Sequence, residues 1–439
     1  MIVKPRNISG FADYSEAENA MLSNWISKIE KTYRLFGFSR LTPRPIELRE
    51  VLLSKGGIQK QIFGISRLQN DAPTDLALPF DRTVPLAYWV AKHHNEITFP
   101  YKRYDISYSY RGERSQAGRF QGFFQADVDI IGNKTLDVNA DSETIGVIYK
   151  TLINLGFDNI YICINELNLV DKILENLNIS HKSKREILNI VDSIQKISEQ
   201  EFIKEVISVT GFAPIIAEDF RNLFLFEGSI SEYKKTLSIK KLINEPVAKY
   251  LNHAEETINY LRDIGIPNDN IIFRPAIVRG LDYYTGIVFE TFVKGHENLG
   301  SVASGGRYDN LASTFTKAVL PGVGGSIGLT RLFDLALKNN LIVLKKNTEA
   351  DVFVGYRINE LKELSNNCAA QLRQLNINTD LYSGQGNFNK QLTYADKKGF
   401  EIAVFMMDKE SILIKNLETG KQVEVNDIKD LINYFKDTP

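Results

Sequence analysis

The feature that most constrains the fold is a long stretch of period-two alternation between residues 103 and 132. One set of alternating positions is polar, and it continues after the loop GERSQAGR: Asp105, Ser107, Ser109 and Arg111, then Gln121, Phe123, Gln125, Asp127 and Asp129. Alternation of this kind is typical of strands whose two faces meet different surroundings. The two runs therefore predict a long antiparallel hairpin with one polar face.

The polar face of this hairpin has two possible interpretations. Arg111, Glu113, Gln125 and Asp129 lie on or beside it and provide guanidinium, carboxylate and amide groups. An α-amino acid and ATP require this mixture, because guanidinium binds phosphate oxygens and carboxylates bind an ammonium or an imidazole. Antiparallel sheets often expose one face to water, however, so alternation alone leaves a binding site and a solvated surface both open.

Glycine-bearing segments further along the chain carry weaker signals. VRGLDYYTG groups Arg279, Asp282, Tyr283 and Tyr284 before a strand, which fits either a ligand site or a core corner. SGGRYDNL and GVGGSIGLTRL fit ordinary turns or close strand–helix packing, and the second does not match a P-loop. The histidines and cysteines lack metal-ligand spacing, so we expect no protein-bound metal.

Length and charge limit the function classes. A chain of 439 residues predicts about three domains, and 43% hydrophobic residues indicate a globular protein. The balance of 53 Lys+Arg against 54 Asp+Glu gives no whole-chain reason to bind DNA or a membrane, so nucleic-acid contacts must be local. No secretory pattern or membrane-spanning stretch is evident and the two cysteines are far apart, so we expect a cytoplasmic protein.

Changes of pattern along the chain predict its domains. A Lys/Glu/Ile/Leu-rich helical stretch interrupts an α+β domain, and strands alternating with helices follow a lysine-bearing connector. The predicted order is the first part of the α+β domain (1–166), a helical insertion (167–262), the second part (263–337), the connector (338–349) and a small α/β domain (350–439).

Taken in order, these blocks resemble the histidyl-tRNA synthetases, a family of class II aminoacyl-tRNA synthetases, over nearly the whole chain. YSYRGERSQAGRFQGFFQADVDIIG is similar to motif 2, GLTRL to motif 3 and TPRPIE to motif 1. VRGLDYYTGIVFE and ASGGRYDNL resemble peptides peculiar to histidyl enzymes, and KQLTYADKKG and IKNLETGKQ resemble an anticodon-binding domain. The resemblance implies an α+β class II catalytic domain, an antiparallel sheet flanked by helices, with a helical insertion and a C-terminal α/β anticodon-binding domain.

The resemblance also implies a histidine site. Asp81, Thr83 and Gln125 would bind the α-amino group. Asp129 and Tyr284 would hydrogen-bond the imidazole, and Tyr283 would line the same pocket. Buried polar groups of this kind discriminate strongly, because a wrong side chain leaves them unpaired.

For ATP, the resemblance assigns three catalytic arginines. Arg111 would hold the α-phosphate and the reacting carboxylate, Arg279 would approach from the opposite side, and Arg331 would contact the γ-phosphate. Glu113 and Phe123 would bind the adenine. In this family the arginine at position 279 takes a part that other class II enzymes give to a metal ion, and Mg²⁺ would arrive with the ATP phosphates.

The implied activity is ATP-dependent ligation of L-histidine to tRNA(His) by a homodimer, through a histidyl-adenylate, with release of pyrophosphate and AMP. No protein nucleophile is required. Local lysines would contact the tRNA: Lys390, Lys397, Lys398, Lys415, Lys421 and the connector pair Lys345 and Lys346, although a solvated surface is an equal interpretation.

The alternative is a non-catalytic histidine sensor, a regulatory subunit of ATP phosphoribosyltransferase. Such chains generally lack the C-terminal domain and the ATP-binding arginines, whereas this chain keeps both. One departure from the family pattern bears on the site. Pro79 stands where the family usually has an arginine, so that contact is either absent or taken over by Arg82.

Overall fold

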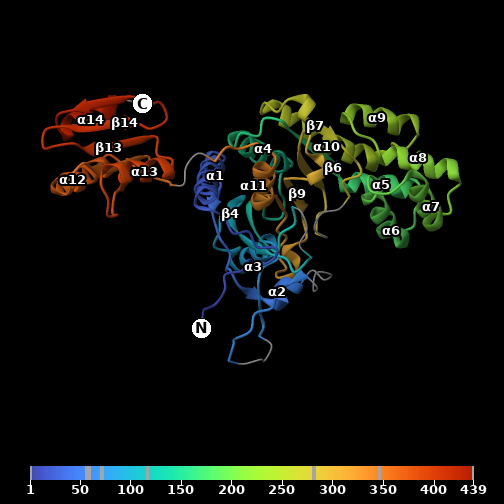
Figure 1. Cartoon of the computed structure of the whole chain (residues 1–439). Helices are drawn as coiled ribbons and strands as arrows, with labels where there is room; N and C mark the ends of the chain where they lie inside the picture. Colours follow the sequence, from blue (N-terminus) through green and yellow to red (C-terminus); the bar gives the residue numbers. More distant parts are fainter. Residues whose placement is uncertain are drawn as a thin grey trace. The chain divides into compact units, whose positions relative to one another are not determined.

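The computed structural model describes residues 2–54, 61–69, 74–114, 118–278, 283–344 and 348–437 (Figure 1). By its internal contacts the chain divides into two compact units. The first contains residues up to 12 together with 26–341, and the second contains 13–25 together with 342–439. Within the described ranges no helix has both the length and the apolar character to cross a membrane.

The predicted hairpin lies within an eight-stranded sheet of the first unit. Its strands are β4 (Tyr101–Tyr110) and β5 (Gly122–Ile131), which pair antiparallel as expected. The strand order is β1-β4-β5-β10-β9-β8-β6-β7, and only the pairs at the two ends, β1 with β4 and β6 with β7, are parallel. The other strands are β1 (Ser39–Arg40), β6 (Ile160–Glu166), β7 (Ile271–Phe273), β8 (Ile287–Val293), β9 (Ala303–Tyr308) and β10 (Gly322–Ile327).

The two faces of this sheet differ in chemistry. One face packs against α4 (Asn139–Asn154), whose Ile148 side chain lies where a Cβ on Gly325 would stand. The other face carries a polar row, because residues paired across neighbouring strands point the same way. The strand register places the following residues in this row: Asp105, Asp127, Ser326, Ser304 and Glu290.

Short elements cover part of the polar face. They are β2 (Glu47–Leu48), α2 (Arg49–Leu53), β3 (Leu76–Ala77) and α3 (Thr83–His93), and β2 pairs antiparallel with β3. Apolar residues of these elements and of the turn before α3, including Leu52, Phe80 and Val84, form one buried cluster with Tyr283 and Tyr308. This packing brings the start of α3 to the sheet.

The predicted helical stretch is confirmed as six helices in the described residues. They are α5 (Leu167–Asn176), α6 (His181–Asp192), α7 (Glu199–Thr210), α8 (Pro214–Phe224), α9 (Ile230–Ile239) and α10 (Glu245–Asp263). Serine N-caps begin α6, α7 and α9, where each side-chain oxygen accepts a backbone N–H that the helix leaves free. Helix α10 packs on α4 and α5. The division of the chain by its internal contacts places these helices in the first unit. A separate insertion domain therefore remains a proposal.

Two further described helices lie wholly or partly in the first unit. The N-terminal helix is α1 (Glu16–Leu35), of which the part from Ile26 onward belongs to the first unit, and α11 (Leu329–Lys338) follows β10. The Tyr33 hydroxyl near the end of α1 donates to the Ala126 carbonyl at 3.1 Å, which ties this part of α1 to β5. Single 3₁₀ turns occupy Asn268–Asn270, Glu297–Leu299 and Ala312–Thr314.

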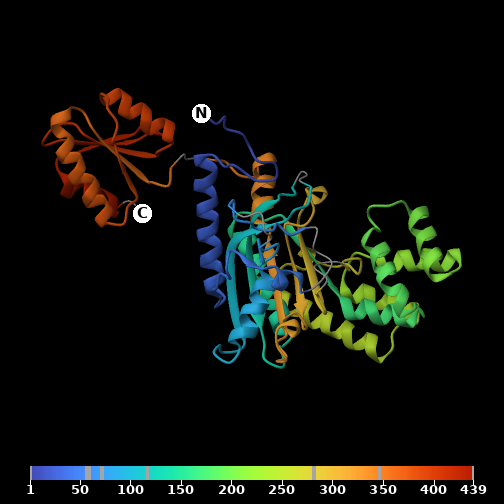
Figure 2. The ribbon, with the colours of Figure 1, turned by 90° about the horizontal axis from the view of Figure 1, so that it is seen from below.

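The second unit contains the predicted alternation of strands and helices (Figure 2). Its sheet has the order β12-β11-β13-β14-β15, parallel over the first three strands and antiparallel over the last three. The bounds are β11 (Val352–Tyr356), α12 (Lys362–Gln374) after a 3₁₀ turn at Asn359–Leu361, β12 (Thr379–Leu381), α13 (Phe388–Lys398), β13 (Ile402–Met406), β14 (Ile412–Asn416), β15 (Gln422–Val425) and α14 (Ile428–Asp437). Phe353 and Phe405 are fully buried in its apolar core.

Candidate active site

Two neighbouring cavities lie over the polar face of the large sheet. The first has a volume of about 280 Å³ and the second about 370 Å³. Four residues line both: Arg111, Gln125, Ser304 and Ser326. The shared wall means that ligands in the two cavities would meet beside the Arg111 guanidinium.

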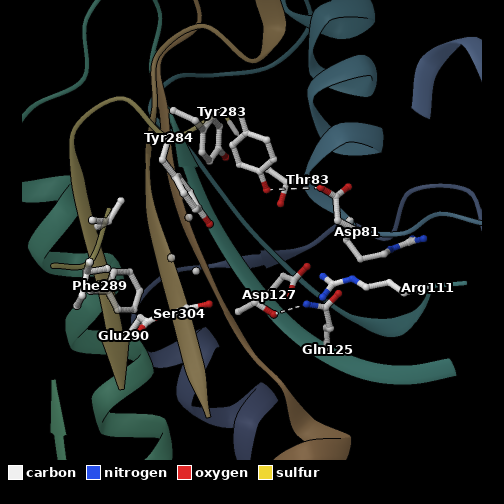
Figure 3. A pocket seen from close by; sticks show the side chains of 18 residues that line it. Asp81, Thr83, Arg111, Gln125, Asp127, Tyr283, Tyr284, Phe289, Glu290 and Ser304 are labelled. Atoms are coloured by element: carbon white, nitrogen blue, oxygen red, sulfur yellow. Dashed lines mark hydrogen bonds between the residues drawn. The ribbon is translucent and has the colours of Figure 1, made fainter. Parts of the chain in front are cut away.

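The first cavity brings together five of the six residues predicted to bind histidine. Asp81, Thr83, Gln125, Tyr283 and Tyr284 line it, from α3 and the turn before it, from β5 and from the segment before β8 (Figure 3). The set is rich in acceptors and phenolic hydroxyls around apolar ring faces. Such a cavity suits a small cationic ligand that carries a ring.

Asp81 is held at the start of α3. Its carboxylate accepts the Val84 N–H at 3.1 Å, and the Tyr283 hydroxyl lies 3.5 Å from its second oxygen. A carboxylate that satisfies a free N–H of a first helical turn is fixed in place. Burial raises the pKa of Asp81 to about 6, so a cation entering the cavity would stabilise its charged form.

Asp127 also lines the first cavity, although the family resemblance assigned it no role. It is 4% exposed and lies opposite Ser326 in the strand register. Burial raises its pKa to about 7. The Gln125 amide donates to the Ser326 hydroxyl at 2.9 Å, so β5 and β10 are joined beside this carboxyl group. The period-two pattern placed Asp127 on the polar face, and this was the sequence signal that could have identified it as a cavity residue.

Asp129 is placed differently from its predicted partners. It is 1% exposed and is not among the described residues that line the first cavity. One of its carboxylate oxygens lies 2.8 Å from the Arg103 Nη2, and the other accepts the Tyr308 hydroxyl at 2.6 Å. A Cβ on Gly324 would fall 2.1 Å from that carboxylate, so a glycine is required there. The imidazole contact of Asp129 remains a prediction.

A buried ionic layer supports the cavity floor. The Arg82 Nε–H donates to Asp105 at 2.9 Å and its Nη2 donates to the Pro43 carbonyl at 2.7 Å. Arg82 and Asp105 are at most 2% exposed. The Arg82 guanidinium therefore links the TPRPIE segment to β4. Arg82 also lines the first cavity, and its taking over the contact that Pro79 removes stays a prediction.

The second cavity contains four of the five residues predicted to bind ATP. Arg111, Glu113, Phe123 and Arg331 line it, together with Arg119. The Arg111 guanidinium lies 5.0 Å from the centre of the Phe123 ring, and its Nε–H donates to the Phe80 carbonyl at 3.2 Å. Three arginines around one cavity favour a polyanion, because guanidinium binds phosphate oxygens in a bidentate manner.

Arg331 is oriented by backbone carbonyls. Its Nε–H donates to Gly118 at 2.9 Å and its Nη1 donates to Ser301 at 3.0 Å. Burial, together with the charges of Arg119 and Arg111, lowers the pKa of Arg331. Mutual repulsion of these cations would be relieved by a bound phosphate chain.

Arg279, the third predicted catalytic arginine, lies outside the described residues. So do Asp282 of the same segment and the connector lysines Lys345 and Lys346. In the described ranges, no group of three or more His, Cys, Asp or Glu side chains is placed to hold a metal ion.

Comparisons with known proteins point to one family. The family model "Histidyl-tRNA synthetase" matches residues 10–332, and the model "Anticodon binding domain" matches residues 341–438. A Clostridium tetani protein named "Histidine--tRNA ligase" is 35% identical over 99% of this chain and 99% of its own length.

Solved structures share the fold. The crystal structure of histidyl-tRNA synthetase from Nostoc sp. PCC 7120 is 31% identical, with a TM-score of 0.89 over 99% of both chains. A Bacillus halodurans chain, titled as an ATP phosphoribosyltransferase regulatory subunit/histidyl-tRNA synthetase, is 20% identical with a TM-score of 0.74. It covers 92% of this chain and 100% of its own, and at that identity it shows the fold alone. On the full-length match and the family model, this chain belongs to the histidyl-tRNA synthetase family.

Proposed function

We propose that this protein is a histidine–tRNA ligase that activates L-histidine with ATP and transfers it to tRNA(His). The observation that carries the proposal is the pair of cavities that share Arg111. One is lined by carboxyl and phenol groups suited to an amino acid, and the other by arginines suited to a triphosphate. Full-length relatives that bear this name support it.

In the first step, the histidine carboxylate attacks the α-phosphorus of ATP in line and pyrophosphate leaves, giving histidyl-adenylate. Arg111 lies between the cavities, where it would hold the carboxylate and the α-phosphate together. Arg279 would stabilise the opposite side of the α-phosphate, and Arg331 would bind the γ-phosphate. Catalysis then comes from positioning and from neutralising phosphate charge.

Substrate recognition follows from the lining residues. Asp81, Thr83 and Gln125 would bind the α-ammonium group, while Tyr284, with Tyr283 beside it, would contact the imidazole. In the second cavity Glu113 and Phe123 would bind the adenine. Mg²⁺ would enter as part of the ATP substrate and neutralise its phosphates.

In the second step, the 3′-terminal hydroxyl of tRNA(His) attacks the acyl carbon and AMP leaves. The unit that contains residues 342–439 would hold the anticodon, with lysines such as Lys390 and Lys421 contacting phosphates. We further propose that the protein acts in the cytoplasm as a homodimer.

The test is histidine-dependent ATP–pyrophosphate exchange by the purified protein, with Arg111→Ala and Arg279→Ala as variants. We expect exchange that requires histidine and falls by about 100-fold or more in each variant, as when a group that stabilises transition-state charge is removed. Histidine binding without exchange would contradict the proposal and favour the regulatory, non-catalytic alternative.

A further inference from the structure

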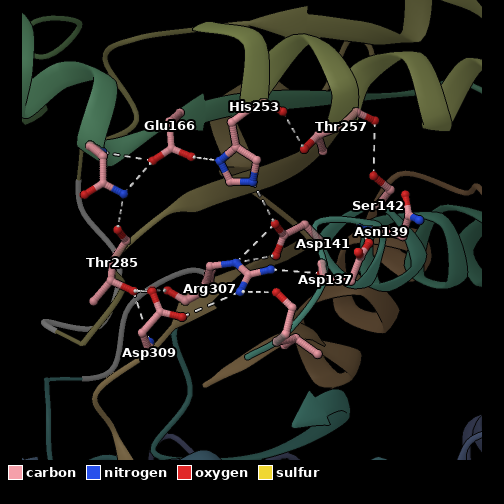
Figure 4. Close-up of polar contacts among 12 residues, drawn as sticks. Asp137, Asn139, Asp141, Ser142, Glu166, His253, Thr257, Thr285, Arg307 and Asp309 are labelled. Carbon is pink, nitrogen blue, oxygen red and sulfur yellow. Dashed lines mark hydrogen bonds and ion pairs between the residues drawn. The ribbon is translucent and has the colours of Figure 1, made fainter. Parts of the chain in front are cut away.

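A second buried ionic cluster lies outside the cavities and is centred on His253 of α10 (Figure 4). The His253 Nδ1 is 2.6 Å from a Glu166 carboxylate oxygen, and its Nε2 is 3.3 Å from an Asp141 carboxylate oxygen. Both carboxylates are fully buried. Because each ring nitrogen faces an acceptor, the geometry favours the doubly protonated imidazolium.

The protonation of His253 agrees with this geometry. Burial alone would lower its pKa, but hydrogen bonds to Asp141 and Glu166 and the charges of these two carboxylates outweigh burial and raise the pKa to about 9. The cluster then holds two buried anions and two cations, because Arg307 also contacts Asp141.

The cluster joins the start and the end of the helical stretch. Glu166 ends β6 and caps α5 by accepting the Asn168 N–H at 2.9 Å. His253 lies on α10, the last helix of the stretch. The ion pair between Glu166 and His253 therefore fixes both ends of the stretch at one point beside α4.

Two routes lead from this point to Thr285. The Asn168 side-chain amide donates to the Thr285 carbonyl at 2.7 Å and also to Glu166 at 3.0 Å. On the other side, the Arg307 Nε–H donates to Asp141 at 3.0 Å, and the Arg307 carbonyl accepts the Thr285 N–H at 2.7 Å.

Every polar group of Thr285 forms a hydrogen bond. Besides its N–H and carbonyl bonds, its hydroxyl donates to Asp309 at 2.7 Å. Thr285 directly follows Tyr284, which lines the first cavity with Tyr283. Displacement of Thr285 would move the cavity wall formed by Tyr283 and Tyr284. A small displacement of such groups weakens ligand binding, because hydrogen bonds depend on their position.

We propose that His253 is a positioning residue for the histidine site: by fixing Glu166 and Asp141 it holds Thr285, and through Thr285 it holds the Tyr283–Tyr284 wall in place. The proposal rests on the proposed function and extends it, because it couples the helical stretch to the amino-acid pocket. Such coupling is reciprocal. A ligand that displaced α5 or α10 would weaken the binding of histidine by some factor, and histidine would weaken the binding of that ligand by the same factor.

The experiment compares two asparagines of the same helix in the full-length protein. Asn168→Ala removes two side-chain hydrogen bonds, one of which reaches Thr285. Asn176→Ala also removes two, to Leu242 and from Asn244, but neither leads to the cavity. Histidine and ATP KM values in exchange, kcat and the thermal midpoint would be measured for both, and for His253→Gln.

We expect Asn168→Ala to raise the histidine KM about fivefold, the effect of one lost hydrogen bond, and to leave the ATP KM within about twofold of wild type. Asn176→Ala should change neither KM. His253→Gln should raise the histidine KM more than Asn168→Ala does. Equal histidine KM values for the two asparagine variants, or an equal rise in both KM values of Asn168→Ala, would overturn the proposal.

Failure of the proposed function would be distinguishable. If the wild type shows no exchange, the histidine Kd measured by calorimetry takes the place of KM. Asn168→Ala should then weaken histidine binding about fivefold relative to Asn176→Ala, again the effect of one hydrogen bond. Equal Kd values would overturn the positioning role in that case as well.

Discussion

The two sheets of this protein differ in the kind of residue that they bury. The large sheet of the first unit buries ionisable groups on one face, among them Arg103, Asp105, Asp127 and Asp129. The sheet of the second unit is packed with apolar side chains. In the described part of residues 348–437, the buried polar residues are Ser365 and Gln391, and both are uncharged.

This difference separates the residues that do chemistry from those that only stabilise. Burying a charge costs several kcal/mol, and a partner offsets that cost only when the geometry is good. A fold that needs only stability uses apolar packing, as the second unit does. The first unit accepts the cost because its paired charges hold carboxyl groups and guanidiniums rigid at the cavity floor.

The sharpest way to break the comparison is Arg103→Ala. The change leaves Asp129 buried without its cation, whereas Asp105 keeps Arg82 and loses only the more distant guanidinium. We therefore expect the free energy of unfolding of the first unit to fall by ~4 kcal/mol. Urea unfolding followed by tryptophan fluorescence measures it. A loss below ~1 kcal/mol would show that the ionic layer does not support the fold.

The matching change in the second unit is Phe353→Ala. Phe353 is fully buried among Tyr382, Tyr394, Phe400 and Phe405, so we expect a cavity that costs ~3 kcal/mol. Histidine-dependent exchange should stay within about twofold of wild type, because the chemistry belongs to the other unit. A comparable loss of exchange would refute that division.

The charge on His253 predicts a pH dependence. Its pKa is raised in the folded state, to about 9, above the unfolded value of 6.5. Its contribution is therefore fully present below about pH 6.5 and is lost as the pH rises through 9. The difference in unfolding free energy between wild type and His253→Gln should shrink by ~2 kcal/mol from pH 6 to pH 10. A constant difference would mean that the side chain is neutral throughout.

The smallest effect is expected from an exposed ion pair. Lys338 lies 2.9 Å from Asp334 on α11, and its side chain is 64% exposed. Lys338→Ala should change the free energy of unfolding by less than ~0.5 kcal/mol, since solvent screens such pairs. Thermal unfolding provides the comparison with Arg103→Ala, and similar losses in the two variants would remove the distinction between buried and surface charge.

The sequence predicted the elements that have a clear period. The hairpin of β4 and β5 was predicted from alternation, and the helical character of the 167–262 stretch was predicted from its composition; both are local properties of the sequence. Helix α4 and strand β6 were not predicted. Both are buried on most sides, so they lack the contrast between apolar and polar faces from which a period can be detected.

The site was predicted in part for the same reason. Motif resemblance and alternation selected Arg111, Gln125 and Asp81, which line the cavities. Alternation placed Asp127 and Asp129 on the same face, and the resemblance selected Asp129. In the structure Asp127 lines the first cavity, and Asp129 is tied to Arg103 and Tyr308. The contacts of His253 join three segments that are distant in sequence, and only tertiary structure brings them together.

The measurement that tests the account most directly compares exchange with tRNA charging in a Lys390→Glu, Lys421→Glu variant of the second unit. Both lysines are exposed. At low salt we predict histidine-dependent exchange within about twofold of wild type and a KM for tRNA(His) raised about tenfold, as expected when phosphate contacts are lost. Exchange and charging that fall together would contradict the assignment of amino-acid activation to the first unit and tRNA binding to the second.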